Sequence, residues 1–388
     1  MLISVSSQPT YLMKPRILFI LHLPPPIHGS AIIGKYIRES ELINGEFESD
    51  FINPSTSTNI SDDMGKWRIG KIYKFLKICA KIFNALLNKK YDLCYFTLTS
   101  SGPGFYRDLP IVFILKLFGK KIIYHFHNKG AAIAGKRKLN DLLYRYTFKK
   151  SLAILLSGYL YYDIEPYVKR EHVFYCPNGI PDYEVSNGRK ITLTSTHSLP
   201  CRLLYLGNMT VEKGVYILLE ACKQLNEKNI CFECHFVGGW SNISKEEFTN
   251  WVVKNELSNI VFSHGPKYDQ EKHTYFDSSD IFVFPSTNEA LPIVNLEAMQ
   301  HGLPVVSTPE GGIRDEVVDG ETGFLVPSNN VDMLAAKLEL LIQNPQLRLE
   351  MGLKGTERFK ELFTLNKFEQ TFTAILKEAI NENSFIKN

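Results

Sequence analysis

A chain of 388 residues is too long for one ordinary hydrophobic core, so we expect two domains. Its composition, 44% hydrophobic and 22% charged, is that of a globular chain and excludes a largely disordered one. The net charge is only +3, but residues 1–185 hold 25 Lys and Arg against 15 Asp and Glu, whereas residues 186–388 hold 19 against 26. The basic first half favours an anionic partner, which could be a membrane surface, a phosphorylated substrate or a nucleic acid.

The seven cysteines are odd in number and lack the spacing of a disulfide framework, which suits thiols in the core of a protein in a reducing compartment. No apolar run approaches the roughly 20 residues that a membrane-spanning helix needs. Ile17–Leu23 resembles the apolar part of a signal peptide, but three prolines follow it without a small-residue cleavage site, so a first buried strand is favoured. Residues 1–12 look like a loose extension ahead of Met13. These features predict a cytoplasmic protein.

The first half alternates apolar runs of strand length with helical patterns. This alternation predicts a parallel sheet covered by helices, an α/β domain that we place at residues 13–183. The expected strands are 17–23, 47–52, 93–98, 121–127, 153–156 and 172–176, and the expected helices include 31–39, 105–118 and 140–150.

Residues Trp67–Asn88 have a helical period and allow two interpretations. One is a helix packed on the core with a solvated basic face. The other is a basic amphipathic element that contacts anionic lipid, which would make the protein peripheral on the inner face of the plasma membrane. The apolar side would carry Ile69, Ile72, Phe75, Leu76, Cys79, Ile82, Phe83 and Leu86, and the basic residues are Lys66, Arg68, Lys71, Lys74, Lys77 and Lys81.

The polar segment Pro181–Pro200 is the best linker candidate, and the α/β pattern restarts after it. We place a second α/β domain at residues 200–364, with a nearly all-helical end over Val331–Glu382. The expected strands are 202–206, 232–237, 260–262, 280–284, 304–307 and 323–326, and a helix is expected at 215–228.

The stretch from Phe284 to Gly302 carries the clearest functional signal. A buried strand ends at Phe284, a polar loop holds Glu289, and a helix that contains Glu297 begins near Pro292. The start of a helix offers unpaired N–H groups that suit a phosphate, whereas carboxylates suit hydroxyl groups. The combination predicts a phosphorylated, hydroxyl-rich ligand such as a nucleotide sugar.

Three more strand-to-helix junctions carry candidate residues. His28 and Gly29 join a strand to a helix whose start could cap a diphosphate, His127 ends a strand on the same face as His125, and Lys213 could neutralise a diphosphate. An ordinary structural role is the alternative for each. No Gly-x-Gly-x-x-Gly, Walker loop or Asp-x-Asp occurs, which disfavours dehydrogenases, NTPases and metal-dependent handling of a diphosphate. The Cys231-x-x-Cys234-His235 pattern of haem attachment is better interpreted as core cysteines on a strand.

Together these pieces resemble the retaining family 4 (group 1) glycosyltransferases, which have the GT-B fold of two Rossmann-like domains facing across a cleft. The match is dense from about Leu203 to Val326 and looser before it. The matching pieces are Pro25-Pro26-x-x-Gly29, His127, Pro177-Asn178-Gly179-Ile180, Leu206-Gly207, Glu212-Lys213-Gly214, Val237-Gly238, Phe262 to Gly265, Phe284-Pro285-Ser286, Glu289-x7-Glu297-Ala298, Gly302-x-Pro304-Val305-Val306, Gly311-Gly312 and Asp319-Gly320-x-x-Gly323.

The resemblance implies a role for each candidate. His127 would contact the sugar that is transferred, Glu289 would hold its hydroxyl groups, and Lys213 would neutralise the diphosphate. Glu297 would accept hydrogen bonds from the ribose. The implied donor site is completed by Gly29, Gly207, Asn208, Gly265 and the backbone of Leu291, Pro292, Ile293 and Val294.

This sequence departs from the family pattern at three positions. Asn208 stands where an arginine is usual, His28 replaces a glycine and could touch phosphate or acceptor, and Ala290 replaces a frequent glycine. Without that arginine, Lys213 and the helix dipoles would have to neutralise more of the diphosphate's negative charge.

The resulting prediction is a metal-independent retaining glycosyltransferase without a cofactor. It would move a hexose or N-acetylhexosamine from a nucleotide-diphospho-sugar to a saccharide, such as a lipid-linked oligosaccharide in surface polysaccharide assembly. The C-terminal helix, at about 365–388, would pack back on the first domain. The alternatives are another GT-B enzyme, such as an epimerase or phosphorylase, and a non-catalytic nucleotide-sugar-binding protein. Nucleic acid is not an expected partner.

Overall fold

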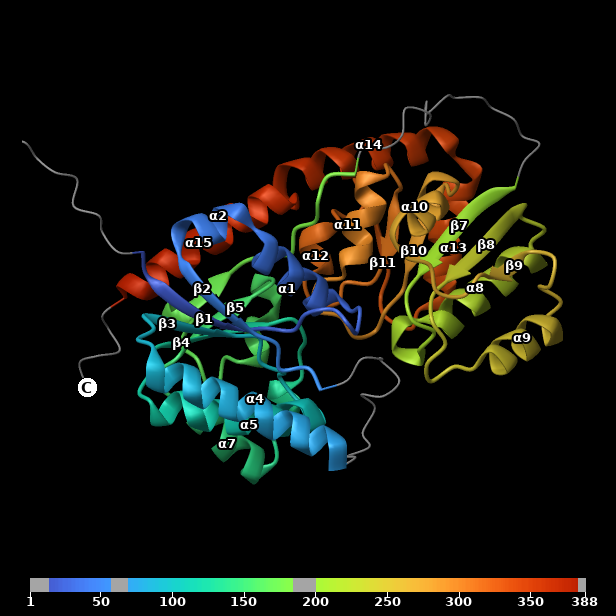
Figure 1. Ribbon diagram of the computed structural model, residues 1–388. Helices are drawn as coiled ribbons and strands as arrows, with labels where there is room; N and C mark the ends of the chain where they lie inside the picture. Colours follow the sequence, from blue (N-terminus) through green and yellow to red (C-terminus); the bar gives the residue numbers. More distant parts are fainter. Residues whose placement is uncertain (1–13, 57–68, 184–199, 383–388) are drawn as a thin grey trace, which may run out of the picture.

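The computed structural model describes residues 14–56, 69–183 and 200–382 of the chain. The predicted extension at residues 1–12 lies outside this part, and so do residues 184–199 of the predicted linker Pro181–Pro200. The described residues form two α/β bodies that lie side by side, each built on a parallel sheet (Figure 1).

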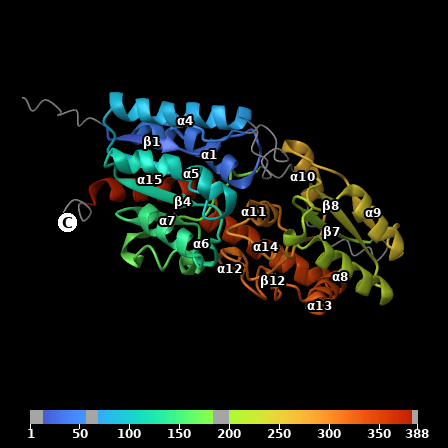
Figure 2. The same ribbon diagram turned by 90° about the horizontal axis from the view of Figure 1, so that it is seen from below.

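The first body contains a six-stranded parallel sheet in the order β2-β1-β3-β4-β5-β6. The central strands β3, β4 and β5 are buried at every position because helices cover both faces, which explains their continuous apolar sequences. Helices α1, α2 and α15 cover one face, and α4, α5 and α7 cover the other (Figures 1 and 2). The bounds are β1 Arg16–Ile20, α1 Gly29–Glu39, α2 Glu41–Glu46, β2 Glu48–Ile52, α4 Ile69–Asn88, β3 Leu93–Phe96, α5 Gly102–Leu117, β4 Ile122–Phe126, α6 Ala131–Ala134, α7 Lys138–Phe148, β5 Leu152–Leu155 and β6 Val173–Tyr175.

The second body repeats this design with the strand order β12-β11-β10-β7-β8-β9, again all parallel. The bounds are β7 Cys201–Leu206, the short 3-10 helix η3 Val211–Lys213, α8 Val215–Glu227, β8 Phe232–Val237, α9 Lys245–Lys254, β9 Val261–Ser263, α10 Asp269–Asp277, β10 Ile281–Phe284, α11 Ile293–Gln300, β11 Val305–Ser307, α12 Ile313–Glu316, β12 Gly323–Leu325, α13 Val331–Gln343 and α14 Pro345–Leu362. The last helix, α15 Leu365–Asn381, belongs to the first body.

The chain runs between the two bodies at two neighbouring points. Ile180 and Thr364 form a β-bridge, and Leu365 N donates to Ile180 O over 2.7 Å. A Cβ on Gly179 would lie 2.5 Å from Thr364 O, so only glycine permits this approach. Helix α15 therefore starts at this point and packs on the first body, where the Phe372 ring lies 5.3 Å from that of Tyr95.

The sequence-based strands and the longer helices are confirmed to within a few residues. The short helices α2, α6, α9, α10 and α12 were not predicted, because each has too few turns to show a clear period.

Two of the predicted burial patterns are wrong in part. In α4, Phe75, Ile82 and Leu86 are buried, but Ile72, Leu76 and Phe83 are exposed. The reason is that one side of a helix can face the core while the flanks of a wide apolar stripe cannot. Cys234 is buried in β8, but Cys231 precedes the strand and is exposed, so it is not a core cysteine. Within the described ranges, no helix is long and apolar enough to cross a bilayer.

Phe372→Ala should loosen α15 from the first body. The side chain is fully buried against Tyr95 and His125, and a Phe-to-Ala change at such a site costs about 3–5 kcal/mol of unfolding free energy. Urea unfolding followed by circular dichroism measures the loss. The control on the same helix, Lys377→Ala, removes only an exposed ion pair with Glu46 and should cost about 1 kcal/mol or less. Equal losses in the two variants would contradict this packing.

Candidate functional site

The second sheet reverses its strand order between β7 and β10, and the loops after these strands lie together. Successive connections leave such a point in opposite directions, so open α/β sheets tend to bind ligands there, at the carboxyl ends of the strands. The loop after β7 leads through η3 to Lys213, and the loop after β10 contains Glu289. The topology thus brings together two of the residues predicted from the sequence.

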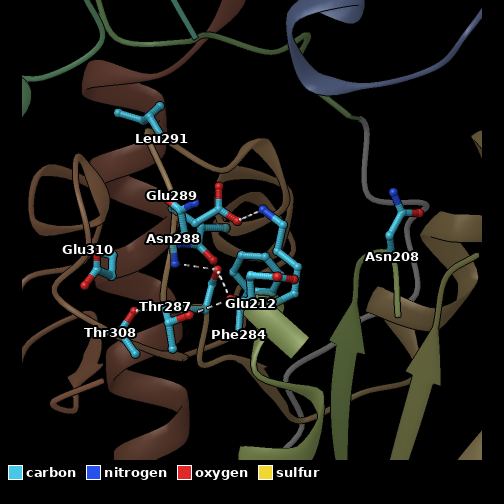
Figure 3. Close-up of polar contacts among 12 residues, drawn as sticks. Asn208, Glu212, Phe284, Thr287, Asn288, Glu289, Leu291, Thr308 and Glu310 are labelled. Carbon is cyan, nitrogen blue, oxygen red and sulfur yellow. Dashed lines mark hydrogen bonds and ion pairs between the residues drawn. The ribbon is translucent and has the colours of Figure 1, made fainter. Parts of the chain in front are cut away.

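Backbone contacts fix these two loops against each other. Gly214 has φ +79°, and a Cβ there would lie 2.1 Å from Pro285 O, so a side chain at this position would separate the loops. The carbonyl of Glu212 accepts hydrogen bonds from Thr287 N at 2.8 Å and from Ser286 Oγ at 3.0 Å (Figure 3). The position of Lys213 relative to Glu289 is therefore set by the backbone.

Lys213 and Glu289 form an ion pair between Nζ and Oε1. The pair is partly buried, and Lys213 Nζ also lies 5.8 Å from the centre of the Phe284 ring. The carboxylate keeps a second oxygen for hydrogen bonds to hydroxyl groups, and the ammonium group can also meet an anion. The pair combines the two chemistries that a sugar phosphate requires.

Helix α11 begins just after Glu289, with Pro292 as its N-cap residue. No side chain of the described residues caps this helix start, so the first N–H groups, including those of Ile293 and Val294, can meet an anion. The carbonyl of Leu291 is already occupied, since it accepts a hydrogen bond from Asn178 Nδ2 of the other body at 3.0 Å. Gly29 also faces α11 from that body, because a Cβ on it would lie 3.7 Å from Ile293 Cδ1.

Glu297 lies inside α11 and pairs with Lys272 of α10, a residue that the sequence analysis missed. Both side chains are mostly buried. The charge of Glu297 also acts on Tyr36 of α1. Burial raises the pKa of the Tyr36 hydroxyl to about 12, and the negative charge of Glu297 contributes to this rise. Nothing in the sequence links Lys272 to Glu297, since the contact arises only when α10 packs beside α11.

Glycines end three neighbouring strands of the second sheet. Gly207 follows β7, Gly238 follows β8, and Gly265 lies just after β9. Gly238 N donates to Gly265 O at 2.9 Å, and a Cβ on Gly238 would lie 1.8 Å from Gly207 O. Gly265 has open space on its Cβ side.

Asn208 also belongs to this edge of the sheet and lies apart from the group around Glu289 (Figure 3). Its carbonyl accepts a hydrogen bond from the Tyr205 hydroxyl at 3.1 Å. The structure therefore brings Lys213 and Glu289 into contact, but it does not bring Asn208 to them.

The carboxyl edge of the first sheet carries a group of histidines. The rings of His125 and His127 lie 4.2 Å apart, which confirms that they share a face. His125 is fully buried, with Nδ1 2.7 Å from the Tyr95 hydroxyl. The Nε2 atom of His127 is enclosed and has no hydrogen-bond partner in the described part of the chain. A buried donor or acceptor without a partner is a candidate for contact with a ligand.

Both His22 and His127 are held neutral. Burial, followed by the charge of His28, lowers the pKa of His127 to about 3. Burial, followed by the charge of Arg107, lowers the pKa of His22 to about 3. His28 is the N-cap of α1, and its Nδ1 accepts a hydrogen bond from Ala31 N at 3.3 Å. A neutral imidazole can donate or accept hydrogen bonds at neutral pH, so these residues suit a polar ligand rather than a counter-ion role.

A pocket of about 720 Å³ opens between the two bodies. The first body lines it with residues after β3, β4 and β5, and the second contributes Thr287 and Asn288 from the Glu289 loop. Lys129 of the lining forms an ion pair with Glu310, at 2.5 Å from Nζ to Oε2, which links the two bodies at the pocket. Lys129 was also missed, because no spacing in the sequence connects it to Glu310. Among the described residues, no group of three or more His, Cys, Asp and Glu could hold a metal ion.

Comparison with known proteins yields a family for the second body. Residues 200–358 match the family described as "Glycosyl transferases group 1". The capsular polysaccharide biosynthesis glycosyltransferase CapM of Staphylococcus aureus is 26% identical over 179 residues, 45% of this chain and 46% of that protein. Matches to the most similar curated relatives span 36% to 46% of their length.

Two solved structures resemble the whole fold. Sucrose-phosphate synthase from Thermosynechococcus elongatus has a TM-score of 0.72 at 18% identity, covering 94% of this chain and 98% of that one. HepE of Anabaena, solved in complex with UDP, has a TM-score of 0.70 at 17% identity, covering 94% and 100%. The predicted GT-B fold is therefore confirmed.

The neutral histidines predict a defined pH dependence of stability. Because the folded-state pKa of His22 and His127 is about 3 and the unfolded value is about 6.5, the unfolded chain binds more protons between these values. As the pH decreases below about 6.5, the free energy of unfolding should therefore decrease, by up to about 1.4 kcal/mol per pH unit for each histidine. Urea unfolding of wild type and the His22→Gln/His127→Gln variant, between pH 7 and pH 5, checks this. An unchanged slope in the variant would contradict the burial of neutral histidines.

Proposed function

We propose that this chain, whose residues 200–358 match the group 1 glycosyltransferases, transfers a hexose or N-acetylhexosamine from a nucleotide-diphospho-sugar to a saccharide. In this proposal the second body binds the donor, the first body binds the acceptor, and the pocket between them receives the acceptor hydroxyl.

The observation that carries the proposal is the Lys213–Glu289 ion pair beside the uncapped start of α11. A diphosphate placed there would meet the ammonium group and the N–H groups of Ile293 and Val294. The carboxylate of Glu289 would then accept hydrogen bonds from the sugar. Glu297, held by Lys272, would receive the ribose hydroxyls, and the open edge at Gly207, Asn208 and Gly265 would receive the base. The complex of the structurally similar HepE with UDP supports a nucleotide as part of the ligand.

We further propose that transfer occurs with retention and without an essential metal. The bond between C1 of the sugar and the diphosphate oxygen breaks, and an acceptor oxygen bonds to C1 on the same face. The acceptor proton passes to the departing phosphate oxygen. Lys213 and the N–H groups of α11 stabilise the charge on this phosphate, and His127, being neutral, can hydrogen-bond the sugar from the other body. His28, next to Gly29, would touch the phosphate or the acceptor.

We propose that the acceptor is a lipid-linked saccharide in surface polysaccharide assembly. We also propose that this protein is peripheral on the inner face of the plasma membrane, where it would reach that acceptor. A biosynthetic role in polysaccharides is supported by the similarity to CapM. A basic first half and exposed apolar positions on α4 support contact with an anionic surface.

Glu289→Ala should abolish most of the transfer, because the variant loses the hydrogen bonds that orient the sugar. The rate of nucleoside diphosphate release should fall about a hundredfold, because a substrate held about 1 Å from its reactive position can lose this much in rate. The assay follows release from a panel of UDP-, GDP- and ADP-sugars in the presence of an acceptor extract. The control, Glu271→Ala, removes an exposed carboxylate in the first turn of α10 that pairs with Lys267, and it should leave the rate unchanged.

The same assay separates the alternatives. An epimerase would convert the donor without an acceptor, a phosphorylase would need inorganic phosphate, and a binding protein would release nothing. Equal rates in wild type and Glu289→Ala would overturn the catalytic assignment.

A further inference from the structure

Glu316 is a buried carboxyl group that the proposed transfer does not use. It lies at the end of α12 and is fully buried, as is Asn295 in the first turn of α11. Asn295 Nδ2 donates to Glu316 Oε2 at 2.7 Å. Arg358 of α14 lies beside it, but its guanidinium donates to the main-chain carbonyls of Asp315 and Glu316. Among the described residues, the carboxyl group of Glu316 therefore has a hydrogen bond but no ion pair.

Two atoms of this side-chain pair lack partners. Glu316 Oε1 and Asn295 Oδ1 are both enclosed, and neither has a hydrogen-bond partner in the part of the chain that the structure describes. If Glu316 were ionised, both atoms would be acceptors only, and burying an acceptor without a donor is unfavourable. A proton on Oε1 would make this oxygen a donor. The acid and the amide could then form a cyclic pair in which Oε1–H donates to Oδ1, so that one proton satisfies both atoms.

The electrostatic surroundings of Glu316 favour the same state. Burial raises the pKa of Glu316 well above its usual value, the hydrogen bond from Asn295 opposes this rise, and the charges of Glu289 and Asp315 add to it. The positive charge of Arg358 is directed at main-chain carbonyls instead of the carboxyl group. A buried carboxyl group that has carboxylates as neighbours and no cation as a partner keeps its proton at neutral pH.

The pair lies close to the proposed donor site. Asn295 belongs to the helix whose first N–H groups would meet the diphosphate. The segment just before α12 contacts the Glu289 loop, because Gly312 N donates to Ala290 O at 2.6 Å. The pair therefore joins two elements that adjoin this loop. An ionised Glu316 would add a negative charge near a site for an anion, whereas a protonated one makes the same connection without a charge.

We propose that Glu316 is a carboxylic acid in the folded protein, that its Oε1–H donates to Asn295 Oδ1, and that this uncharged pair positions the start of α11. Glu316 is a positioning residue, because it is buried and acts through Asn295. Its protonation does not depend on the proposed transfer, whereas its effect on the bound diphosphate rests on that function.

Infrared difference spectroscopy tests the protonation directly. The C=O stretch of a carboxylic acid is separate from the bands of a carboxylate, so the spectrum of wild type minus Glu316→Gln at neutral pH should contain the acid band. The matched control is Glu321→Gln, which changes an exposed glutamate of the same segment and should remove carboxylate bands only. A loss of carboxylate bands in Glu316→Gln as well would overturn the proposal.

The pH dependence of stability is a second test. The unfolded-state pKa of a glutamate is about 4.3 and that of folded Glu316 lies well above it, so between these values the folded chain binds more protons. Stability should therefore decrease as the pH rises, until the folded-state pKa is passed. In urea unfolding between about pH 5 and pH 8, the unfolding constant of wild type should rise relative to that of Glu316→Gln by up to about tenfold per pH unit. A ratio that stays constant with pH would overturn the protonation.

Nucleoside diphosphate release tests the effect on the donor site. Glu316→Gln should retain release at neutral pH, because the glutamine amide can form both hydrogen bonds with Asn295 without a charge. Asn295→Asp gives a pair of carboxyl groups that would share one proton and carry a negative charge, so release should fall about tenfold or more. A normal rate in Asn295→Asp would overturn the effect on the diphosphate. An acid band without release from wild type would support the protonation and contradict the proposed transfer alone.

Discussion

The candidate site depends on the backbone contact between the loops after β7 and β10. Gly214 lies so close to Pro285 that no side chain fits between them, and the carbonyl of Glu212 receives hydrogen bonds from Ser286 and Thr287. These contacts do not involve the side chains that would bind a ligand. Lys213 and Glu289 are therefore placed by the fold, and the cost of ordering them is met when the chain folds rather than when a ligand binds.

The second constraint is the way in which the two bodies meet. Asn178 donates to Leu291, Lys129 pairs with Glu310, and the chain passes between the bodies at Ile180 and Thr364. The first of these contacts adjoins the start of α11, and the second lies at the pocket. In the proposed transfer, the neutral histidines of the first body and the ion pair of the second would act on the ligands from opposite sides. This arrangement suits the transfer of a group between two substrates, one held by each body.

Much of the fold could be predicted, because continuous apolar strands and alternating helices have strong periodicities in the sequence. Lys213, Glu289 and the start of α11 could be placed because each lies in a connection between a buried strand and the next helix. Lys272 and Lys129 could not, because their partners Glu297 and Glu310 lie on separate elements that meet only in the tertiary structure.

The central claim is that Lys213, Glu289 and the start of α11 form one binding site for a nucleotide-diphospho-sugar. A crystal structure of the protein with UDP bound tests it most directly. The diphosphate should lie within hydrogen-bond distance of Lys213 Nζ and of the first N–H groups of α11, with the ribose at Glu297. UDP bound elsewhere, with the Lys213–Glu289 pair untouched, would contradict the account.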